Sequence, residues 1–218
     1  MDGAISETLT EKFIFACHQV ARHGLVVCGS GNLSCRADNE HMLITTTGAW
    51  LSEVTKDETA LCRISDGVCL NGKKPSMELG FHRSILSARE DVDVILHFAS
   101  PFATTLACSK NQTYDRFSVI PEIPYYIGPV ATVPYAPPGS PDLAAAVTNA
   151  IREHELVILQ NHGQVTVGRD FRDALQKALY FEFASSICLR AGDNLQTLEK
   201  EDVEALSRTR QTISQNVT

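Results

Sequence analysis

The sequence predicts a three-layer α/β/α protein, in which helices cover both faces of a central, mostly antiparallel sheet. Short apolar segments rich in β-branched residues alternate with segments whose apolar residues recur at helical spacing. Gly-Asn, Asp-Asn and Asp-Gly pairs separate the first strand-like segments, and such pairs are typical of turns between antiparallel strands. No repeat or low-complexity linker is present, so residues 1–218 are expected to form one domain with a polar C-terminal tail from about residue 211.

Helices are expected where apolar residues repeat every three to four positions between suitable ends. Gly24 is a natural stop for the first helix. Ser140 followed by Pro141 predicts a helix start, because serine caps free N–H groups and proline fits the first turn. Asp170 is expected to cap a long helix. The predicted helices cover residues 8–23, 76–88, 100–109, 140–153, 174–189 and a last region from about 201.

Strands are expected at the short apolar segments. The segments 92–97 and 156–161 are rich in β-branched residues and too short for confident helices. The second of them and residues 164–167 flank a turn at His162 and Gly163. The other predicted strands are residues 25–28, 33–36, 42–46, 60–64, 68–70 and 130–135.

The composition excludes several classes of protein. Of the 218 residues, 44% are hydrophobic and 21% are charged, and the net charge is −7. No cluster of lysine and arginine is present, so a nucleic-acid partner is not expected. No signal peptide is recognisable and no apolar stretch approaches the roughly 20 residues of a membrane span, so no membrane association is expected. The seven cysteines include no Cys-x-x-Cys pair, which favours a reducing, cytoplasmic location over a disulfide framework.

Two strand-like segments end in a histidine, which places an imidazole at the rim of the sheet. These histidines are His97 and His162, and Glu78 at the start of a predicted helix is a candidate carboxylate partner. Neutral imidazoles and a carboxylate are ligands that catalytic divalent metals prefer. Each histidine could equally be a core or turn residue, since sequence spacing does not show proximity.

Three segments of small residues could bind an anion such as phosphate, because their backbone N–H groups can converge on it. Two of them follow the pattern of a turn, and the third opens a predicted helix, whose N-terminus attracts anions. In isolation, each segment is as well explained by an ordinary turn or a helix cap. The candidate phosphate-binding residues are Ser30, Gly31, Asn32, Thr47, Gly48 and Ser76.

In this order along the chain, the motifs together resemble the class II aldolase/adducin family. The resemblance covers nearly the whole chain, from about residue 10 to residue 190, and is closest to the L-fuculose-1-phosphate aldolase branch. The motifs that support it are GSGNLS at 29–34, ITTTG at 44–48, PSME at 75–78, FH at 81–82, LH at 96–97, AP at 136–137 and QNHG at 160–163.

The resemblance implies a zinc-dependent enzyme with active sites between the subunits of a homotetramer. It implies that Glu78, His97 and His162 bind this divalent metal ion, which is expected to be Zn²⁺. Tyr125, in an Ile-Pro-x-Ile-x-Tyr segment, matches a tyrosine that donates a proton from a neighbouring subunit, although Tyr126 beside it leaves the choice open. The family's phosphate-binding loops match Asn32, Thr47, Gly48 and Ser76.

Two positions depart from the family pattern. The family's His-x-His reads His97-Phe98-Ala99, so one zinc ligand is missing. Met77 replaces the second serine of a phosphate-binding pair, which removes one hydrogen bond to phosphate. Three protein ligands and a water still form a catalytic set, with a weaker expected affinity for the metal.

The implied reaction cleaves a ketose 1-phosphate of the L-fuculose 1-phosphate type to dihydroxyacetone phosphate and an aldehyde such as L-lactaldehyde. Glu78 is expected to act as base and Tyr125 to transfer a proton at the C4 oxygen. A Schiff-base mechanism would need a buried lysine, whereas Lys73, Lys74 and Lys177 are all expected at the surface. The alternatives are a non-catalytic assembly module similar to the adducin head, and a sugar-phosphate epimerase or dehydratase on the same scaffold.

Overall fold

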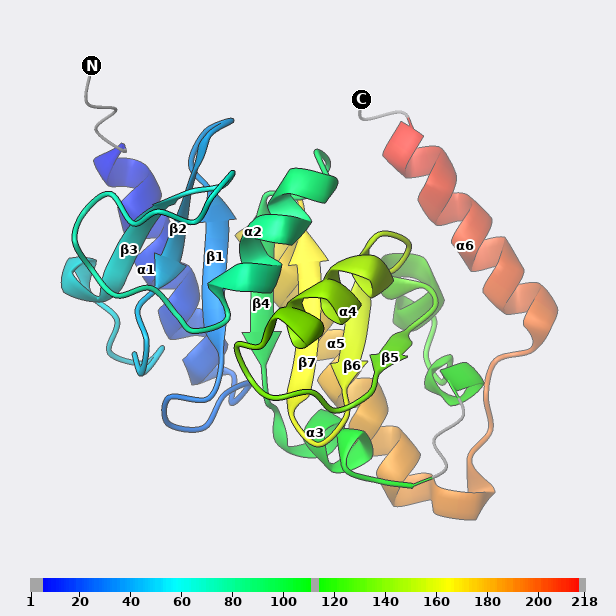
Figure 1. Ribbon diagram of the computed structural model, residues 1–218. Helices are drawn as coiled ribbons and strands as arrows, with labels where there is room; N and C mark the ends of the chain where they lie inside the picture. Colours follow the sequence, from blue (N-terminus) through cyan, green and yellow to red (C-terminus); the bar gives the residue numbers. More distant parts are fainter. Residues whose placement is uncertain (1–5, 111–113, 216–218) are drawn as a thin grey trace.

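The computed structural model describes the backbone of residues 6–110 and 114–215. Seven strands form one sheet in the order β3-β2-β1-β4-β7-β6-β5, with helices on both faces (Figure 1). Neighbouring strands run antiparallel except for the parallel pair of β5 and β6, which confirms the predicted fold class. The strands are β1 (Asn32–Arg36), β2 (His41–Thr45), β3 (Thr59–Arg63), β4 (Val94–Phe98), β5 (Ala131–Val133), β6 (Leu156–Leu159) and β7 (Gly163–Gly168).

Six α-helices lie within the described residues. Their caps follow the predictions, since the Ser140 hydroxyl accepts the N–H of Leu143 and the Asp170 carboxylate accepts the N–H of Asp173. The helices are α1 (Glu7–Arg22), α2 (Leu79–Ala88), α3 (Pro101–Ala107), α4 (Pro141–Ile151), α5 (Phe171–Ala191) and α6 (Lys200–Gln215). Four short helical segments are η1 (Lys56–Glu58), η2 (Tyr114–Phe117), η3 (Ile123–Ile127) and η4 (Gly192–Asn194).

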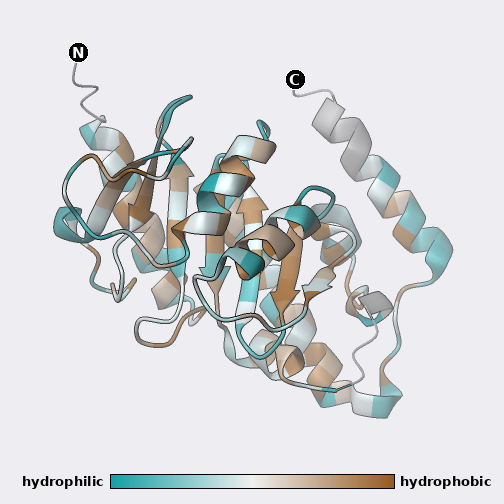
Figure 2. Cartoon of the chain, viewed as in Figure 1, coloured by the Kyte–Doolittle hydropathy of each residue, from teal (hydrophilic) through white to brown (hydrophobic). Residues whose placement is uncertain are grey.

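The two faces of the sheet bury two separate apolar cores. Leu96 and Phe98 of β4 join the core beneath α1, α3 and α5, whereas Ile95 joins the core beneath α2 and α4. Successive residues of a strand point to opposite faces, so His97 projects to the side of α2. Figure 2 shows the apolar residues concentrated on the strands, with β6 apolar along its length. Among the described residues, no helix is long and apolar enough to cross a membrane.

Three predicted elements differ in the structure. Residues 25–28 form no strand, because Cys28 has a φ of 52°, a left-handed conformation that extended chains do not adopt. Residues 68–70 pair with β3 through a single isolated bridge, Cys62 with Cys69, and do not form a full strand. The helix expected from residue 76 begins at Leu79, because Pro75 forms a β-bridge with Thr46 and the Ser76 N–H donates to the Thr45 carbonyl.

The other boundaries differ by a few residues, apart from the C-terminal end. The long helix α5 begins at Phe171, directly after its cap, and extends to Ala191. At the C-terminal end, α6 continues to Gln215, so the backbone is helical beyond residue 211, where the sequence predicts a polar tail.

Candidate metal centre

Glu78, His97 and His162 lie together at one end of the sheet. Glu78 is the residue before α2, His97 is near the end of β4, and His162 lies in the turn between β6 and β7. One potential ligand atom from each lies within 4.8 Å of the other two. The structure therefore brings together the three residues that the sequence predicts as metal ligands.

The turn that presents His162 depends on a strained residue and a glycine. Asn161 has a φ of 54°, and its N–H donates to the Ala107 carbonyl at 3.0 Å. A Cβ atom at Gly163 would lie 2.5 Å from the Phe98 carbonyl oxygen, so a side chain does not fit there. The close approach of the β6–β7 turn to β4 places the ring centroids of His162 and His97 4.8 Å apart.

His97 is held in place by β7, a strand that pairs with β4. Its Nδ1 lies 2.9 Å from the Gln164 carbonyl oxygen, to which the Nδ1–H donates. This hydrogen bond leaves the Nε2 lone pair facing Glu78, whose Oε2 is 3.4 Å away. A carbonyl acceptor behind an imidazole is the arrangement that commonly orients metal-binding histidines.

A buried chain of hydrogen bonds holds Glu78 from behind. The Asn32 Nδ2–H donates to Glu78 Oε2 at 2.9 Å, and Asn32 Oδ1 lies 2.5 Å from His82 Nε2. His82 Nδ1 in turn lies 2.7 Å from the Ser34 hydroxyl. Because the Asn32 oxygen can only accept, the consistent assignment is a neutral His82 that donates from Nε2 and accepts from Ser34.

Burial favours the neutral form of two imidazoles near the cluster, those of His82 and His162. Complete burial, with a smaller contribution from His97, lowers the pKa of His82 well below its usual value. Burial and the neighbouring His97 also lower the pKa of His162, while Glu78 acts in the opposite direction. Neutral imidazoles have the lone pair that a metal requires.

Two buried atoms of the cluster have no hydrogen-bond partner among the described residues, namely Glu78 Oε1 and His162 Nδ1. Glu78 is only 4% exposed, and a buried carboxylate is costly unless it is paired or coordinates a metal. Oε1 lies 3.6 Å from His162 Nε2, beyond hydrogen-bonding distance. One carboxylate and two imidazoles with their nitrogens in reach of one another therefore fit a divalent cation.

The predicted phosphate residues lie in loops that contact this cluster and one another. A Cβ at Gly31 would lie 2.8 Å from the His97 carbonyl oxygen, so only glycine fits this approach to β4. The Thr47 hydroxyl donates to the Pro75 carbonyl at 2.7 Å, and the Ser76 hydroxyl accepts the Glu78 N–H at 3.3 Å. The Ser30 hydroxyl accepts the Val27 N–H within its own turn.

Gly48 and Asn32 complete the predicted set. The Gly48 carbonyl oxygen would be 3.4 Å from a Cβ at Gly29, so the loops around residues 29 and 48 are adjacent. Asn32 is 7% exposed and uses both ends of its amide within the cluster. One amide N–H of Asn32 remains for a further acceptor, so a contact with phosphate is compatible with its hydrogen bond to Glu78.

The structure places Tyr125 away from the cluster of its own chain. Tyr125 lies on η3, which packs against α5 and α6 (Figure 1). Its ring makes an edge contact with Tyr126 at 4.6 Å, and Tyr126 stacks on Tyr180. The proton-donating role of Tyr125 therefore requires a neighbouring subunit and stays a prediction.

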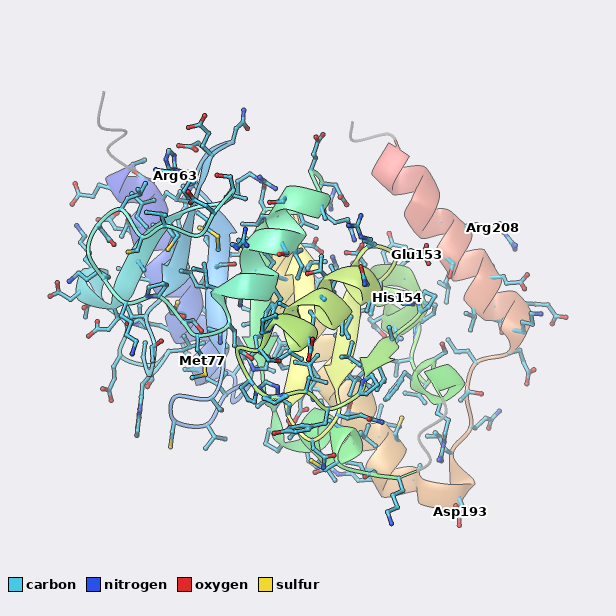
Figure 3. All side chains as sticks on the ribbon, in the orientation of Figure 1. Arg63, Met77, Glu153, His154, Asp193 and Arg208 are labelled. Carbon is cyan, nitrogen blue, oxygen red and sulfur yellow. The ribbon has the colours of Figure 1, made fainter. Side chains whose placement is uncertain are left out.

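The two departures from the family pattern lie at the cluster. The Ala99 N–H donates to the Leu25 carbonyl, and its methyl group would be 3.4 Å from a Cβ at Gly163, next to His162. Within the described ranges, the group of potential ligands contains no fourth His, Cys, Asp or Glu side chain. Met77, labelled in Figure 3, is 62% exposed. Its neighbours Ser76 and Glu78 are buried.

One lysine prediction is wrong. Lys177 is 5% exposed, and its ammonium group donates to Glu155 at 2.7 Å, to Asp173 at 3.0 Å and to the Val167 carbonyl. The register of α5 turns this side chain inward, where two carboxylates compensate its charge. A paired ammonium group is not a nucleophile, so the structure offers no support for a Schiff base at Lys177.

Sequence reasoning missed His82 and Ser34 as parts of the site. A signal was present, because His82 follows Glu78 by four residues and Ser34 follows Asn32 by two. These spacings place each pair on one face of a helix or strand.

The fold and this cluster define an α/β/α protein with a candidate divalent-metal centre where strands β4 and β6 end. The sequence profile of the Class II Aldolase and Adducin N-terminal domain family matches residues 11–189, and the chain belongs to this family.

Curated relatives include two kinds of enzyme. The chain is 34% identical over 154 residues to a 3-oxo-tetronate 4-phosphate decarboxylase of Haemophilus influenzae, covering 69% of this chain and 72% of the relative. It is 32% identical over 170 residues to an L-fuculose phosphate aldolase of Methanococcus maripaludis, covering 78% and 90%.

Solved structures agree with the fold. YgbL of Klebsiella pneumoniae superposes with a TM-score of 0.87 at 26% identity, covering 94% of this chain and 100% of the other. An L-fuculose 1-phosphate aldolase superposes with a TM-score of 0.85 at 23% identity, covering 94% and 97%.

Proposed function

We propose that this protein is a metal-dependent lyase that cleaves a ketose 1-phosphate of the L-fuculose 1-phosphate type to dihydroxyacetone phosphate and an aldehyde. The observation that supports this most directly is the buried group of Glu78, His97 and His162, with an unpartnered carboxylate oxygen. Membership of the family and the similarity to an L-fuculose phosphate aldolase agree with it.

In this proposal, Glu78, His97 and His162 hold one divalent ion, which we expect to be Zn²⁺. When bound, such an ion supplies positive charge next to the substrate oxygens that become negative as the carbon–carbon bond breaks. Glu78 Oε1 accepts no hydrogen bond from the described residues and can accept a proton, while Asn32 keeps the carboxylate in place through Oε2.

The rest of the substrate contacts the loops around the cluster. Backbone N–H groups near Gly31, Thr47 and Gly48, with the Ser76 hydroxyl, bind the phosphate in this proposal. Binding the phosphate supplies energy at a distance from the breaking bond. Tyr125 of a neighbouring subunit in a homotetramer protonates the leaving oxygen. A cytoplasmic location remains the expectation from the cysteine content.

A second candidate is decarboxylation of a phosphorylated 3-oxo acid. Relatives at 34% and 30% identity are 3-oxo-tetronate 4-phosphate decarboxylases. Loss of CO₂ from such an acid and cleavage of the ketose phosphate both leave negative charge on a carbon next to a carbonyl group. Both also release dihydroxyacetone phosphate, so the same cluster could serve either reaction.

The two candidates differ in the second product. We would supply the purified protein with Zn²⁺ or Mn²⁺, incubate it with L-fuculose 1-phosphate or with 3-oxo-tetronate 4-phosphate, and measure dihydroxyacetone phosphate by a coupled dehydrogenase. Dihydroxyacetone phosphate with L-lactaldehyde supports the aldolase, whereas dihydroxyacetone phosphate with CO₂ supports the decarboxylase. Product from neither substrate, in protein that holds metal, would contradict both. Protein that holds no metal and forms no product favours an assembly module.

A further inference from the structure

Cys62 and Cys69 face each other across two antiparallel segments, away from the metal centre. Cys62 belongs to β3, and Cys69 lies in the segment that returns beside it. The Arg63 N–H donates to the Val68 carbonyl at 2.9 Å, and the Leu70 N–H donates to the Leu61 carbonyl at 2.8 Å. These two bonds flank the cysteines, which therefore form a non-hydrogen-bonded pair, the arrangement with the shorter Cα separation of about 4.5 Å.

Both cysteine side chains point to the same face of the sheet, as directly opposed residues of antiparallel strands do. Cys62 is fully buried in the core beneath α2 and α4, and Cys69 packs against that same core from a half-buried position. A Cα separation of about 4.5 Å lies within the range that a disulfide spans. The pairing geometry therefore favours a disulfide between Cys62 and Cys69.

The two thiols differ in accessibility. Burial, with a contribution from Cys69, raises the pKa of the Cys62 thiol to about 12. The Cys69 thiol is partly accessible and donates to Asn71 Oδ1 at 3.2 Å. Cys69 is consequently the sulfur that a dissolved oxidant reaches first, and Cys62 is placed to react second.

We propose that Cys62 and Cys69 form a reversible disulfide, a modification site separate from the metal centre, when the protein meets a peroxide. Hydrogen peroxide oxidises the Cys69 thiol to a sulfenic acid, its O–O bond breaks, and one water leaves. The Cys62 sulfur then attacks the Cys69 sulfur, the S–S bond forms, and the hydroxyl group leaves as a second water with the Cys62 proton. Two thiols lose two electrons, and one peroxide becomes two waters.

The remaining cysteines provide internal comparisons. Cys17, Cys35 and Cys188 are buried, and burial is the main cause that raises the pKa of each. Cys28 and Cys108 are exposed, and neither has a cross-strand cysteine opposite it in the described sheet. Among these positions, only the Cys62–Cys69 pair combines an opposed partner with access to solvent.

The cysteine pair is connected to the metal centre only through the polypeptide chain. The segment after Cys69 passes through residues 70–75 and reaches Ser76 and Glu78. A disulfide at Cys69 would fix the start of this segment to β3.

Peptide mapping tests the proposal. The protein is treated with hydrogen peroxide, its free thiols are alkylated under denaturing conditions, and it is digested with trypsin, which cuts after Arg63. We expect a loss of two of the seven free thiols and a linked pair of peptides, 57–63 with 64–73. A dithiol reductant should restore both thiols.

Two variants control the experiment. Cys69→Ser keeps a hydroxyl donor for Asn71 and should abolish the linked peptides, whereas Cys108→Ser should leave them unchanged. Recovery of Cys62 as a free thiol after peroxide treatment, or a disulfide from Cys69 to Cys28 or Cys108, would overturn the proposal. Failure of a dithiol to reverse the link would overturn its reversibility.

Discussion

The hydrogen-bond chain behind Glu78 gives a quantitative prediction for metal affinity. Asn32→Leu removes the amide that donates to Glu78 Oε2 at 2.9 Å, between residues that are 7% and 4% exposed. A buried hydrogen bond to a charged group contributes about 1.5–3 kcal/mol. Loss of such an outer contact commonly weakens metal binding by about 10- to 100-fold, and we expect a decrease of this size.

The assay is competition between the metal-free protein and a chelator for Zn²⁺, without substrate, so that any role of Asn32 in phosphate binding does not contribute. Ser34→Ala is the matched control, because it removes only the outer hydrogen bond to His82. We expect Ser34→Ala to change the affinity by less than about threefold, consistent with a neutral hydrogen bond one step further from the ligand. Urea unfolding checks that each variant is folded.

Two results would refute this reasoning. A folded Asn32→Leu protein with the wild-type affinity for Zn²⁺ would show that Asn32 does not position Glu78. An equal loss of affinity in Ser34→Ala would show that the effect comes from general disruption of the core.

Three further predictions concern activity and stability. Glu78→Gln should reduce turnover by about 100- to 10,000-fold with the fold intact by circular dichroism, and a near-normal rate would remove Glu78 from the mechanism. Burial lowers the pKa of His82, so below about pH 6.5 the unfolded chain binds a proton at this residue and the folded chain does not. The free energy of urea unfolding of the metal-free protein should therefore fall as the pH decreases, by about 1.4 kcal/mol per pH unit. The His82→Gln variant should show a shallower decrease. Gly163→Ala should lower the unfolding free energy by about 2 kcal/mol or more, since its Cβ would meet the Phe98 carbonyl oxygen at 2.5 Å; unchanged stability would contradict the close approach.

The sequence allowed the layers of the fold and the three candidate ligands to be predicted. Periodicity identifies β4 and β6, and a histidine at the end of a strand is visible in the sequence itself. Glu78 is a candidate carboxylate from its place at the start of a predicted helix, and the family resemblance implies the same role. The distances between the three ligands could not be predicted without the strand order. This order places β4 between β1 and β7 and brings His97 opposite Asn32.

Other features depend on backbone conformation and register that periodicity does not reveal. Residues 25–28 have the composition of a strand, but Cys28 adopts a positive φ. Lys177 lies on a helix face that the tertiary packing buries against Glu155 and Asp173. Asn32 matched a phosphate loop in the sequence, and only the register of β1 against β4 shows that its amide contacts Glu78.

The most direct test of the metal centre is the metal content of the purified protein after incubation with Zn²⁺ and extensive dialysis, measured by inductively coupled plasma mass spectrometry. We predict one ion per chain, and loss of that ion when both His97 and His162 are replaced by alanine in a protein that remains folded. A wild-type protein that retains no ion, or a double variant that retains as much as the wild type, would contradict a centre built from Glu78, His97 and His162.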